Sequence, residues 1–383
     1  MEPKSLAETA ELVSGLVKIP SVTGNAAKAG EAADFIVKWL GENGVSAKIK
    51  EFEKGFPTVI AQAGSGSRSL MLNGHLDVVP EGDHAKWGHD PYSGLISGKT
   101  VFGRGSVDMK SGLAVQMRLL SDFADKTDFR LIFAAVSDEE TGGFNCSKHL
   151  AEEYLVDTVL VGEPGGSELI GVGEKGLLDV RLSGRGKTSH ASRPSLGDNA
   201  IMKVVRDLER LSKVGEIDIQ FPTELKEILQ ESIKENGKDV GIITFNPGTI
   251  NGGTKLNVVP DACESDVDMR IPPGISIDNA LSRIKGLLKE VDVSLLITSE
   301  PNYTSPTIPE VAKFIRIAKK HAPNARLIIK NGGTDGRYFR SKGMPVVAFG
   351  PGNYGLMHTY DECVSFSEIA RAYDIYSEFL SSF

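Results

Sequence analysis

The feature that most constrains this chain is a set of isolated acidic and histidine residues, each of which follows an apolar run of sequence. The set comprises His75, Asp108, Glu139, Glu140, Glu163 and His358. Short apolar runs are typical of buried strands, and a buried strand that ends in an uncompensated charge is costly to fold. A pair of metal ions at the strand ends removes that cost. The pattern therefore predicts a metal centre, and with it an enzyme.

Size and composition favour a soluble protein of two domains. The chain has 383 residues, of which 40% are hydrophobic and 25% charged, and this length exceeds what one ordinary core supports. A net charge of −8 argues against nucleic acid or an anionic membrane as a partner. Because the sequence shows neither a membrane-length apolar stretch nor a signal-peptide core, we expect a cytoplasmic location.

The two ends of the chain alternate predicted helices and strands. Helical spacing of apolar residues covers 6–17, 26–40, 112–120, 309–321 and 367–380, and β-rich runs cover 58–61, 70–72, 129–136, 326–329 and 346–349. Ligand candidates at strand ends fit an open α/β sheet, whose sites form at the carboxyl edge. Residues 1–175 and 299–383 are therefore predicted to form one α/β catalytic domain with a mixed open sheet.

The middle of the chain has a different pattern. Residues 176–182 alternate apolar and polar side chains, as a half-exposed antiparallel strand does. Further strands are predicted at 241–245, 262–271 and 293–298, with helices at 199–211 and 277–291. This order predicts an inserted α+β domain of ferredoxin-like type at 176–298.

The residue types narrow the chemistry of the metal centre. A donor set of nitrogen and oxygen without sulfur suits zinc, with cobalt or manganese as alternatives. Asp77 lies two residues from His75 on one strand, so both side chains lie on the same face, where Asp77 can orient the imidazole. Glu139 and Glu140 are adjacent, and one can bind metal while the other acts as general base.

Four segments carry a resemblance to a known family. Residues 73–80, 103–112, 138–143 and 162–164 resemble the motifs of the di-zinc aminoacylase and peptidase family, which includes succinyl-diaminopimelate desuccinylase, acetylornithine deacetylase and glutamate carboxypeptidase. The resemblance implies two Zn2+ per subunit, bridged by Asp108. It pairs His75 with Glu163 as ligands of one ion, and Glu140 with His358 as ligands of the other. It makes Glu139 the base and Asp77 the residue that orients His75, and implies a cis peptide at Asp108-Met109.

The resemblance also extends to residues that would contact substrate. In the family, the histidine that matches His190 reaches the active site of the neighbouring subunit and polarises the scissile carbonyl. The resemblance therefore implies a homodimer, in which the inserted domain 176–298 serves in dimerisation or as a lid. A simple turn histidine is the alternative. Arg270 could hold a substrate carboxylate or pair with Asp266 or Asp268. The family has other residues that contact the substrate carboxylate, and in this sequence they are matched by Asn257, Gly333 and Thr334.

These observations predict a zinc-dependent hydrolase that cleaves the N-acyl amide of an amino acid, a small-molecule substrate. The desuccinylase and acetylornithine deacetylase types, of lysine and arginine biosynthesis, resemble it most. A succinyl group needs a second cation, for which Arg193, Lys175 or Arg337 could serve. The alternatives are a metallo-carboxypeptidase or dipeptidase of the same family, and a non-catalytic protein that keeps the fold. The last predicts damage to the ligand set, yet every member is present.

Overall fold

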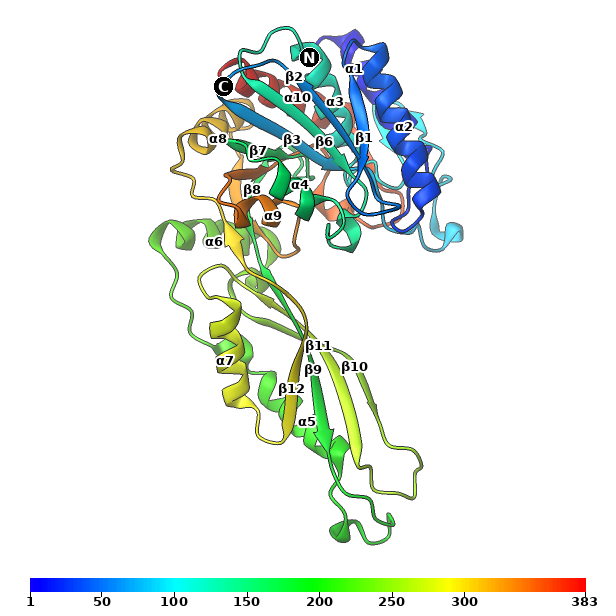
Figure 1. Cartoon of the computed structure of the whole chain (residues 1–383), viewed down its shortest axis with the longest axis vertical. Coiled ribbons are helices and arrows are strands. Elements are labelled where there is room, and N and C mark those ends of the chain that lie inside the picture. Colours follow the sequence, from blue (N-terminus) through cyan, green and yellow to red (C-terminus); the bar gives the residue numbers. More distant parts are fainter. The chain divides into compact units, whose positions relative to one another are not determined.

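The computed structural model describes residues Met1–Phe383, which divide into two compact units. The first unit comprises Met1–Val172, Thr304–Leu327 and Thr334–Phe383, and the second comprises Gly173–Tyr303 and Ile328–Gly333. In Figure 1 the first unit accordingly contains both the blue N-terminal and the red C-terminal segments. The segment 176–298 lies within the second unit. This unit also includes residues 328–333, where the chain re-enters it, and no local sequence pattern indicates this.

The first unit is built from helices on a mixed sheet. Its helices are α1 (Pro3–Val17), α2 (Ala26–Glu42), α3 (Lys110–Phe123), α4 (Ser147–Glu153), α8 (Pro309–His321), α9 (Gly336–Ser341) and α10 (Phe366–Ser381). Its main strands are β1 (Ala47–Glu51), β2 (Pro57–Ala63), β3 (Ser69–His75), β6 (Arg130–Val136), β7 (Thr158–Val161) and β15 (Val346–Ala348), followed in the sheet by β8 (Leu169–Glu174), which leads into the second unit. A small separate sheet contains β4 (Ile96–Ser97), β5 (Thr100–Phe102) and β16 (Cys363–Ser365). None of the helices has the length and apolar character that a bilayer crossing requires.

The order of strands brings several carboxyl ends together. The main sheet runs β1-β2-β6-β3-β7-β15-β8-β13, where β13 is Asn302–Tyr303, and β14 (Arg326–Lys330) also pairs with β8. Its centre is parallel, with His75 of β3 opposite Val136 of β6, and Asn73 of β3 opposite Val161 of β7. Because parallel neighbours end at the same edge, the residues that follow β3, β6 and β7 meet there.

Helices cover both faces of this sheet, so its central strands are buried and mostly apolar. Along β6, Ile132 and Ala134 pack in a buried cluster with Leu150 of α4 and Phe339 of α9. Figure 1 shows α3 and α10 behind the strands, on the face opposite α4. The predicted α/β class with a mixed sheet is confirmed.

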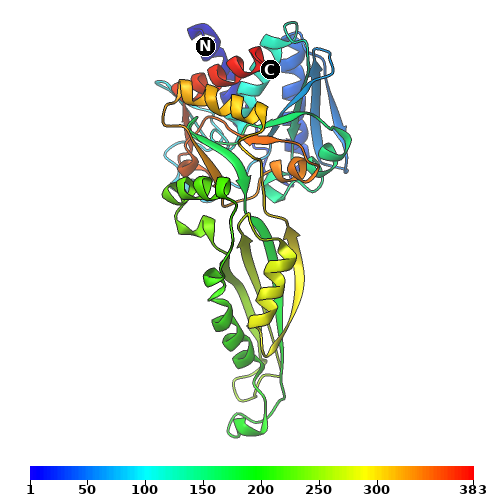
Figure 2. The same ribbon diagram turned by 90° about the vertical axis from the view of Figure 1, so that its left-hand side faces the viewer.

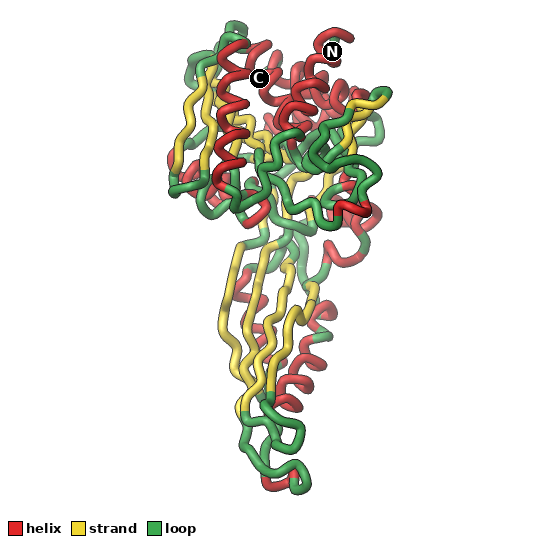
Figure 3. Tube along the Cα trace, turned by 90° about the vertical axis from the view of Figure 1, so that its right-hand side faces the viewer, coloured by secondary structure: helices red, strands yellow, loops and turns green.

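The second unit is a four-stranded antiparallel sheet with helices on one face. The strands β9 (Gly176–Arg185), β10 (Thr244–Gly252), β11 (Ala262–Ile271) and β12 (Val291–Ser299) lie in the order β10-β11-β9-β12. The helices α5 (Ala200–Leu211) and α7 (Ile277–Leu287) cover one side of the sheet (Figures 2 and 3). This is the ferredoxin-like βαββαβ arrangement, to which α6 (Thr223–Asn236) is added.

Two predicted boundaries in the second unit shift for identifiable reasons. The helix expected to reach 291 ends at Leu287, because the buried Asp207 carboxylate accepts hydrogen bonds from the backbone N–H groups of residues 289–291. The strand expected from 241 begins at Thr244, because the ammonium of buried Lys175 takes the carbonyls of Asp239 and Ile242 out of sheet pairing. Helix α6 and the short strand β1 (Ala47–Glu51) were not predicted.

Candidate metal centre

The candidate ligands lie in the first unit, at the shared edge of its parallel strands. His75 is the last residue of β3, Glu139 and Glu140 form a short 3-10 turn after β6, and Glu163 follows β7 by two residues. Asp108 precedes α3, and His358 lies in the loop before β16. The structure therefore gathers both ends of the sequence around one point.

The Asp108 carboxylate stands between the two histidines. Its Oδ1 lies 3.0 Å from His75 Nε2, and its Oδ2 lies 3.1 Å from His358 Nε2. His75 Nε2 lies 3.8 Å from Glu163 Oε1, and His358 Nε2 lies 3.3 Å from Glu140 Oε1. One oxygen toward each histidine is the arrangement that a bridging carboxylate needs.

Two groups of donor atoms are compact enough for a metal ion. Ligand atoms of His75, Asp108 and Glu140 lie within 4.8 Å of one another, and so do those of His75, Glu139 and Glu163. The structure thus brings together all five predicted ligands and the predicted base.

Asp77 supports this cluster in more ways than the sequence indicated. His75 Nδ1 lies 2.9 Å from the backbone carbonyl of Asp77 and 3.5 Å from its carboxylate. Because a carbonyl only accepts, Nδ1 donates a hydrogen bond to it, and Nε2 is the nitrogen that faces Asp108. The Asp77 carboxylate also accepts the backbone N–H groups of Glu139 and Glu140, at 3.3 and 3.2 Å. It therefore fixes both the imidazole and the glutamate turn.

Burial and like charge act strongly on this cluster. Burial, followed by the nearby Glu163 carboxylate, raises the pKa of Glu139 well above its usual value. Burial also raises the pKa of Glu140 to about 7, against the opposing hydrogen bond from His358. Burial would raise the pKa of Asp108 too, but hydrogen bonds from His358 and His75 hold it well below its usual range. Hydrogen bonds to Asp108 and Glu140 raise the pKa of His358 to about 10.

This chemistry fits a pair of divalent cations. Carboxylates outnumber imidazoles, and His75, Asp108 and Glu163 are at most 5% exposed. Buried acidic groups in contact repel one another unless positive charge compensates them. Nitrogen and oxygen donors without sulfur are those of zinc, cobalt and manganese sites.

His190 and Asn257 lie in the second unit, on adjoining exposed loops. The Ala191 N–H donates to the Asn257 carbonyl at 3.0 Å. The Ser192 N–H donates to His190 Nδ1 at 3.2 Å. Because that nitrogen accepts, a neutral His190 carries its hydrogen on Nε2, where it can donate to another group.

The basic side chains that could bind a carboxylate of the substrate differ in their surroundings. Arg270 pairs with Asp268, with Nη2 2.8 Å from Oδ2, which is one of the two structural partners considered for it. Lys175 is buried and bound to backbone carbonyls, so its ammonium is not free for a ligand. Arg337 donates to the Gly142 carbonyl at 2.5 Å, beside the glutamate turn, while Arg193 is exposed.

The remaining predicted contacts lie in one loop that passes from one unit to the other. Gly333 belongs to the second unit and Thr334, which is 3% exposed, to the first. The peptide bond Asp108-Met109 is cis, as the resemblance implies.

Three buried residues beside the cluster escaped the sequence reasoning. Glu362 accepts the backbone N–H of Asp108 at 3.1 Å and forms an ion pair with Arg104. Lys110 donates to the carbonyls of Leu16 and Ile19, and burial lowers its pKa to about 7. Arg104 stands between two glycines in the segment 103–112 that carries the family resemblance, but Glu362 follows no apolar run and has no local signal.

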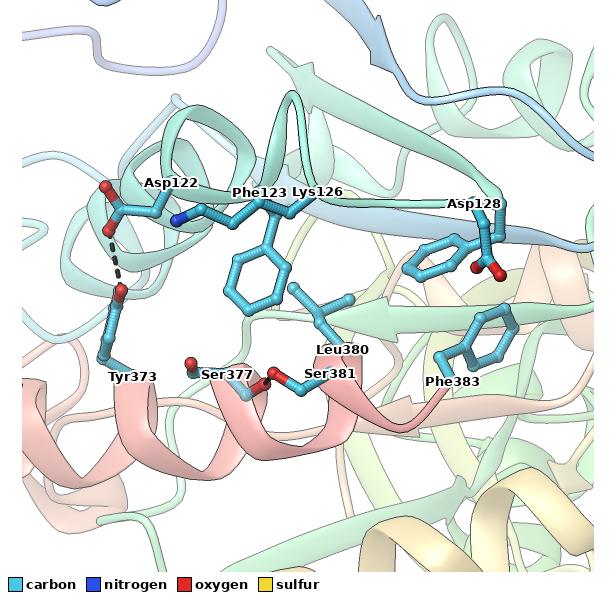
Figure 4. Close-up of a pocket in the computed structure, with 10 residues that line it drawn as sticks. Asp122, Phe123, Lys126, Asp128, Tyr373, Ser377, Leu380, Ser381 and Phe383 are labelled. Atoms are coloured by element: carbon cyan, nitrogen blue, oxygen red, sulfur yellow. Dashed lines mark hydrogen bonds between the residues drawn. The ribbon is translucent and has the colours of Figure 1, made fainter.

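A separate cavity of about 440 Å3 lies between the end of α3, the loop after it and α10 (Figure 4). Asp122, Lys126, Tyr373 and Phe383 line it, and the Tyr373 hydroxyl donates to Asp122 at 2.6 Å. It contains none of the clustered histidines and carboxylates, so it is not part of the metal centre.

Comparison with known proteins gives consistent matches over the whole chain. The sequence model described as Peptidase family M20/M25/M40 matches residues 71–382. A probable succinyl-diaminopimelate desuccinylase from Staphylococcus aureus is 25% identical, over 97% of this chain and 96% of its own length. An acetylornithine deacetylase from Aliivibrio fischeri is 28% identical, over 91% of this chain and 90% of its own length. The structure of an M20 family metallo-carboxypeptidase from Sulfolobus solfataricus superposes with a TM-score of 0.78 at 21% identity, covering 100% of this chain and 99% of that one, which shows a shared fold.

Proposed function

The chain belongs to peptidase family M20/M25/M40, and from this membership we propose that it is a zinc-dependent hydrolase that cleaves the N-acyl amide of an amino acid. The observation that carries the proposal is the Asp108 carboxylate, with one oxygen toward His75 and the other toward His358. His75 and Glu163 would hold one Zn2+, and Glu140 and His358 would hold the other. Asp108 would be a ligand of both ions. When bound, such ions lower the pKa of water and polarise a carbonyl.

Glu139 would move the proton in this reaction. Its carboxylate lies in the same compact group as His75 and Glu163, and its backbone is fixed by Asp77. In that position it can take a proton from the attacking water and return it to the leaving nitrogen. The step balances: the C–N bond breaks, the nitrogen leaves as an amine with one proton of the water, and the oxygen and other proton of the water complete a carboxylic acid, which then ionises.

The substrate contacts would come from the second unit, apart from Thr334, which belongs to the first. His190 Nε2 can donate to the oxyanion that forms at the scissile carbonyl, and Arg270, Asn257, Gly333 and Thr334 would hold the carboxylate of the amino acid. We propose that His190 acts across a homodimer. Exposed apolar residues on the outer strands β10 and β12 support a partner surface, namely Ile250, Leu295, Leu296 and Ile297.

The substrate class follows from the named relatives. Proteins called desuccinylase and acetylornithine deacetylase match at 25% and 28% identity over nearly the whole chain, which supports an acylated amino acid of lysine or arginine biosynthesis as the substrate. The cytoplasmic location stays a prediction from the sequence. A carboxypeptidase or dipeptidase activity is the second candidate, favoured by the fold shared with a metallo-carboxypeptidase.

A substrate panel with metal-reconstituted protein tests this proposal. N-succinyl-diaminopimelate, N-acetylornithine and a set of dipeptides are offered to the wild type, to Glu139→Ala and to Glu42→Gln, an exposed control. We expect turnover of an acyl amino acid that is lost in Glu139→Ala and kept in the control. Unchanged turnover in Glu139→Ala would remove this residue from its role, and hydrolysis of dipeptides alone would favour the peptidase.

Subunit mixing tests the role of His190. Inactive His190→Ala and Glu139→Ala proteins are unfolded together, refolded and assayed. If His190 serves the neighbouring subunit, mixed dimers contain one complete site and regain part of the activity. A mixture as inactive as its components would contradict action across the dimer.

A further inference from the structure

A buried ion pair joins two segments that both carry proposed metal ligands. Arg104 Nη1 lies 2.6 Å from Glu362 Oε2, and the side chains are 3% and 0% exposed. Arg104 lies four residues before Asp108, and Glu362 four residues after His358. Taking two charges out of water is costly and is repaid only by excellent geometry and further hydrogen bonds, so the surroundings of this pair are informative.

The other oxygen of Glu362 holds the backbone at Asp108. Its Oε1 accepts the N–H groups of Val107 at 2.8 Å and Asp108 at 3.1 Å. One carboxylate thus binds a guanidinium and the start of the segment that presents the bridging aspartate. Rotation of the Asp108 backbone would break these bonds inside the protein, where water cannot replace them.

The same pair also fixes the segment that carries His358. Arg104 Nη2 donates to the His358 carbonyl at 3.4 Å, and the Gly103 N–H donates to the Glu362 carbonyl at 2.8 Å. Directly after this point, Cys363 pairs with Phe102 in the small sheet. His358 itself is 46% exposed on its loop, so little else packs around its side chain.

We propose that Arg104 and Glu362 are positioning residues that set the spacing of Asp108 and His358, and thereby the affinity for the ion held by His358 and Glu140. The inference rests on the proposed two-metal function. It assigns a role to two residues that touch neither substrate nor metal. Since His75 and Glu163 are held by β3 and β7, the other ion should depend much less on this pair.

The test is a Co2+ titration of metal-free full-length protein, followed by visible absorption and calorimetry. In Glu362→Gln, which keeps the size of the side chain, one of the two binding constants should fall about 10–100-fold while the other changes much less. Arg104→Lys keeps the charge opposite Glu362 but loses the guanidinium fork, and should change the same constant in the same direction. If Glu362→Gln does not fold, Arg104→Lys carries the test alone.

Asp207→Asn is the matched control. Asp207 is also a fully buried carboxylate that pairs with an arginine, Arg210, and accepts backbone N–H groups, but it lies in the second unit. It should lower stability and leave both constants unchanged. Equal constants in wild type and Glu362→Gln, or the same selective loss in Asp207→Asn, would overturn the positioning role alone. A wild type that binds no pair of ions would overturn the proposed function as well.

Discussion

Asp77 offers the sharpest test of how the metal centre is built. Its Oδ2 accepts the Thr23 hydroxyl at 2.7 Å and the Glu140 N–H at 3.2 Å. Its Oδ1 accepts the Glu139 N–H at 3.3 Å and lies 3.5 Å from His75 Nδ1. A single carboxylate that is 1% exposed thus connects His75 with the turn that carries Glu139 and Glu140.

Asp77→Asn replaces one of these oxygens by an NH2 group. At the Oδ1 position the amide faces the Glu139 N–H, and at the Oδ2 position it faces the Glu140 N–H. Either orientation sets donor against donor and leaves one backbone N–H unpaired, at a cost of about 1–3 kcal/mol. The turn is then held less firmly, so we also expect metal affinity to fall about 10–100-fold, as for other residues that orient metal ligands.

Urea unfolding of the metal-free protein measures the first effect, and a metal titration measures the second. Thr23→Val is the control, because it removes one hydroxyl from Asp77 and leaves both backbone bonds in place. It should cost about 1 kcal/mol and leave metal affinity unchanged. If Asp77→Asn matched the wild type in both measurements, the view of Asp77 as the support of the glutamate turn would be refuted.

Three further predictions follow from other parts of the structure. In Gly112→Ala the new Cβ would lie 2.0 Å from the Gly162 carbonyl oxygen, closer than real contacts allow. We expect its free energy of unfolding in urea to fall by about 1–3 kcal/mol. In the control Gly30→Ala the new Cβ meets nothing within 4 Å, and the free energy of unfolding should rise by about 0.4–1 kcal/mol. Burial lowers the pKa of Lys175 to about 7, whereas the lysine of the unfolded chain keeps its proton to about pH 10.4. Between these pH values the unfolded state binds more protons, so the free energy of unfolding should rise with pH by up to about 1.4 kcal/mol per pH unit. Urea unfolding of Lys175→Met should lack this slope. Removal of metal by a chelator should lower the melting temperature in calorimetry, and Zn2+ should restore it, because an ion at about 100 times its Kd stabilises the folded state by about 2.7 kcal/mol.

Local sequence patterns were sufficient for much of the first unit. The predicted strand 129–136 became β6 (Arg130–Val136), and the helix predicted at 309–321 is α8. Both follow from the periodicity of apolar residues, which a buried element must satisfy whatever its neighbours are. Charged residues at the ends of such runs were visible for the same reason.

Boundaries in the second unit depended on distant partners instead. Helix α7 stops at Leu287 because the carboxylate of Asp207, on another helix, binds the backbone that follows. The apolar pattern beyond that point continues as a strand. No window of sequence contains both the helix end and the residue that stops it.

The sequence by itself determined the set of candidate metal ligands, because buried carboxylates and imidazoles after apolar runs are costly unless a cation or a partner compensates them. Only the tertiary structure decided that Asp108 stands between His75 and His358, and that Glu362 holds the Asp108 backbone. The physical reason is that side-chain periodicity is a local property of the chain. The meeting of segments about 250 residues apart is instead set by strand order and by the packing of helices on the sheet.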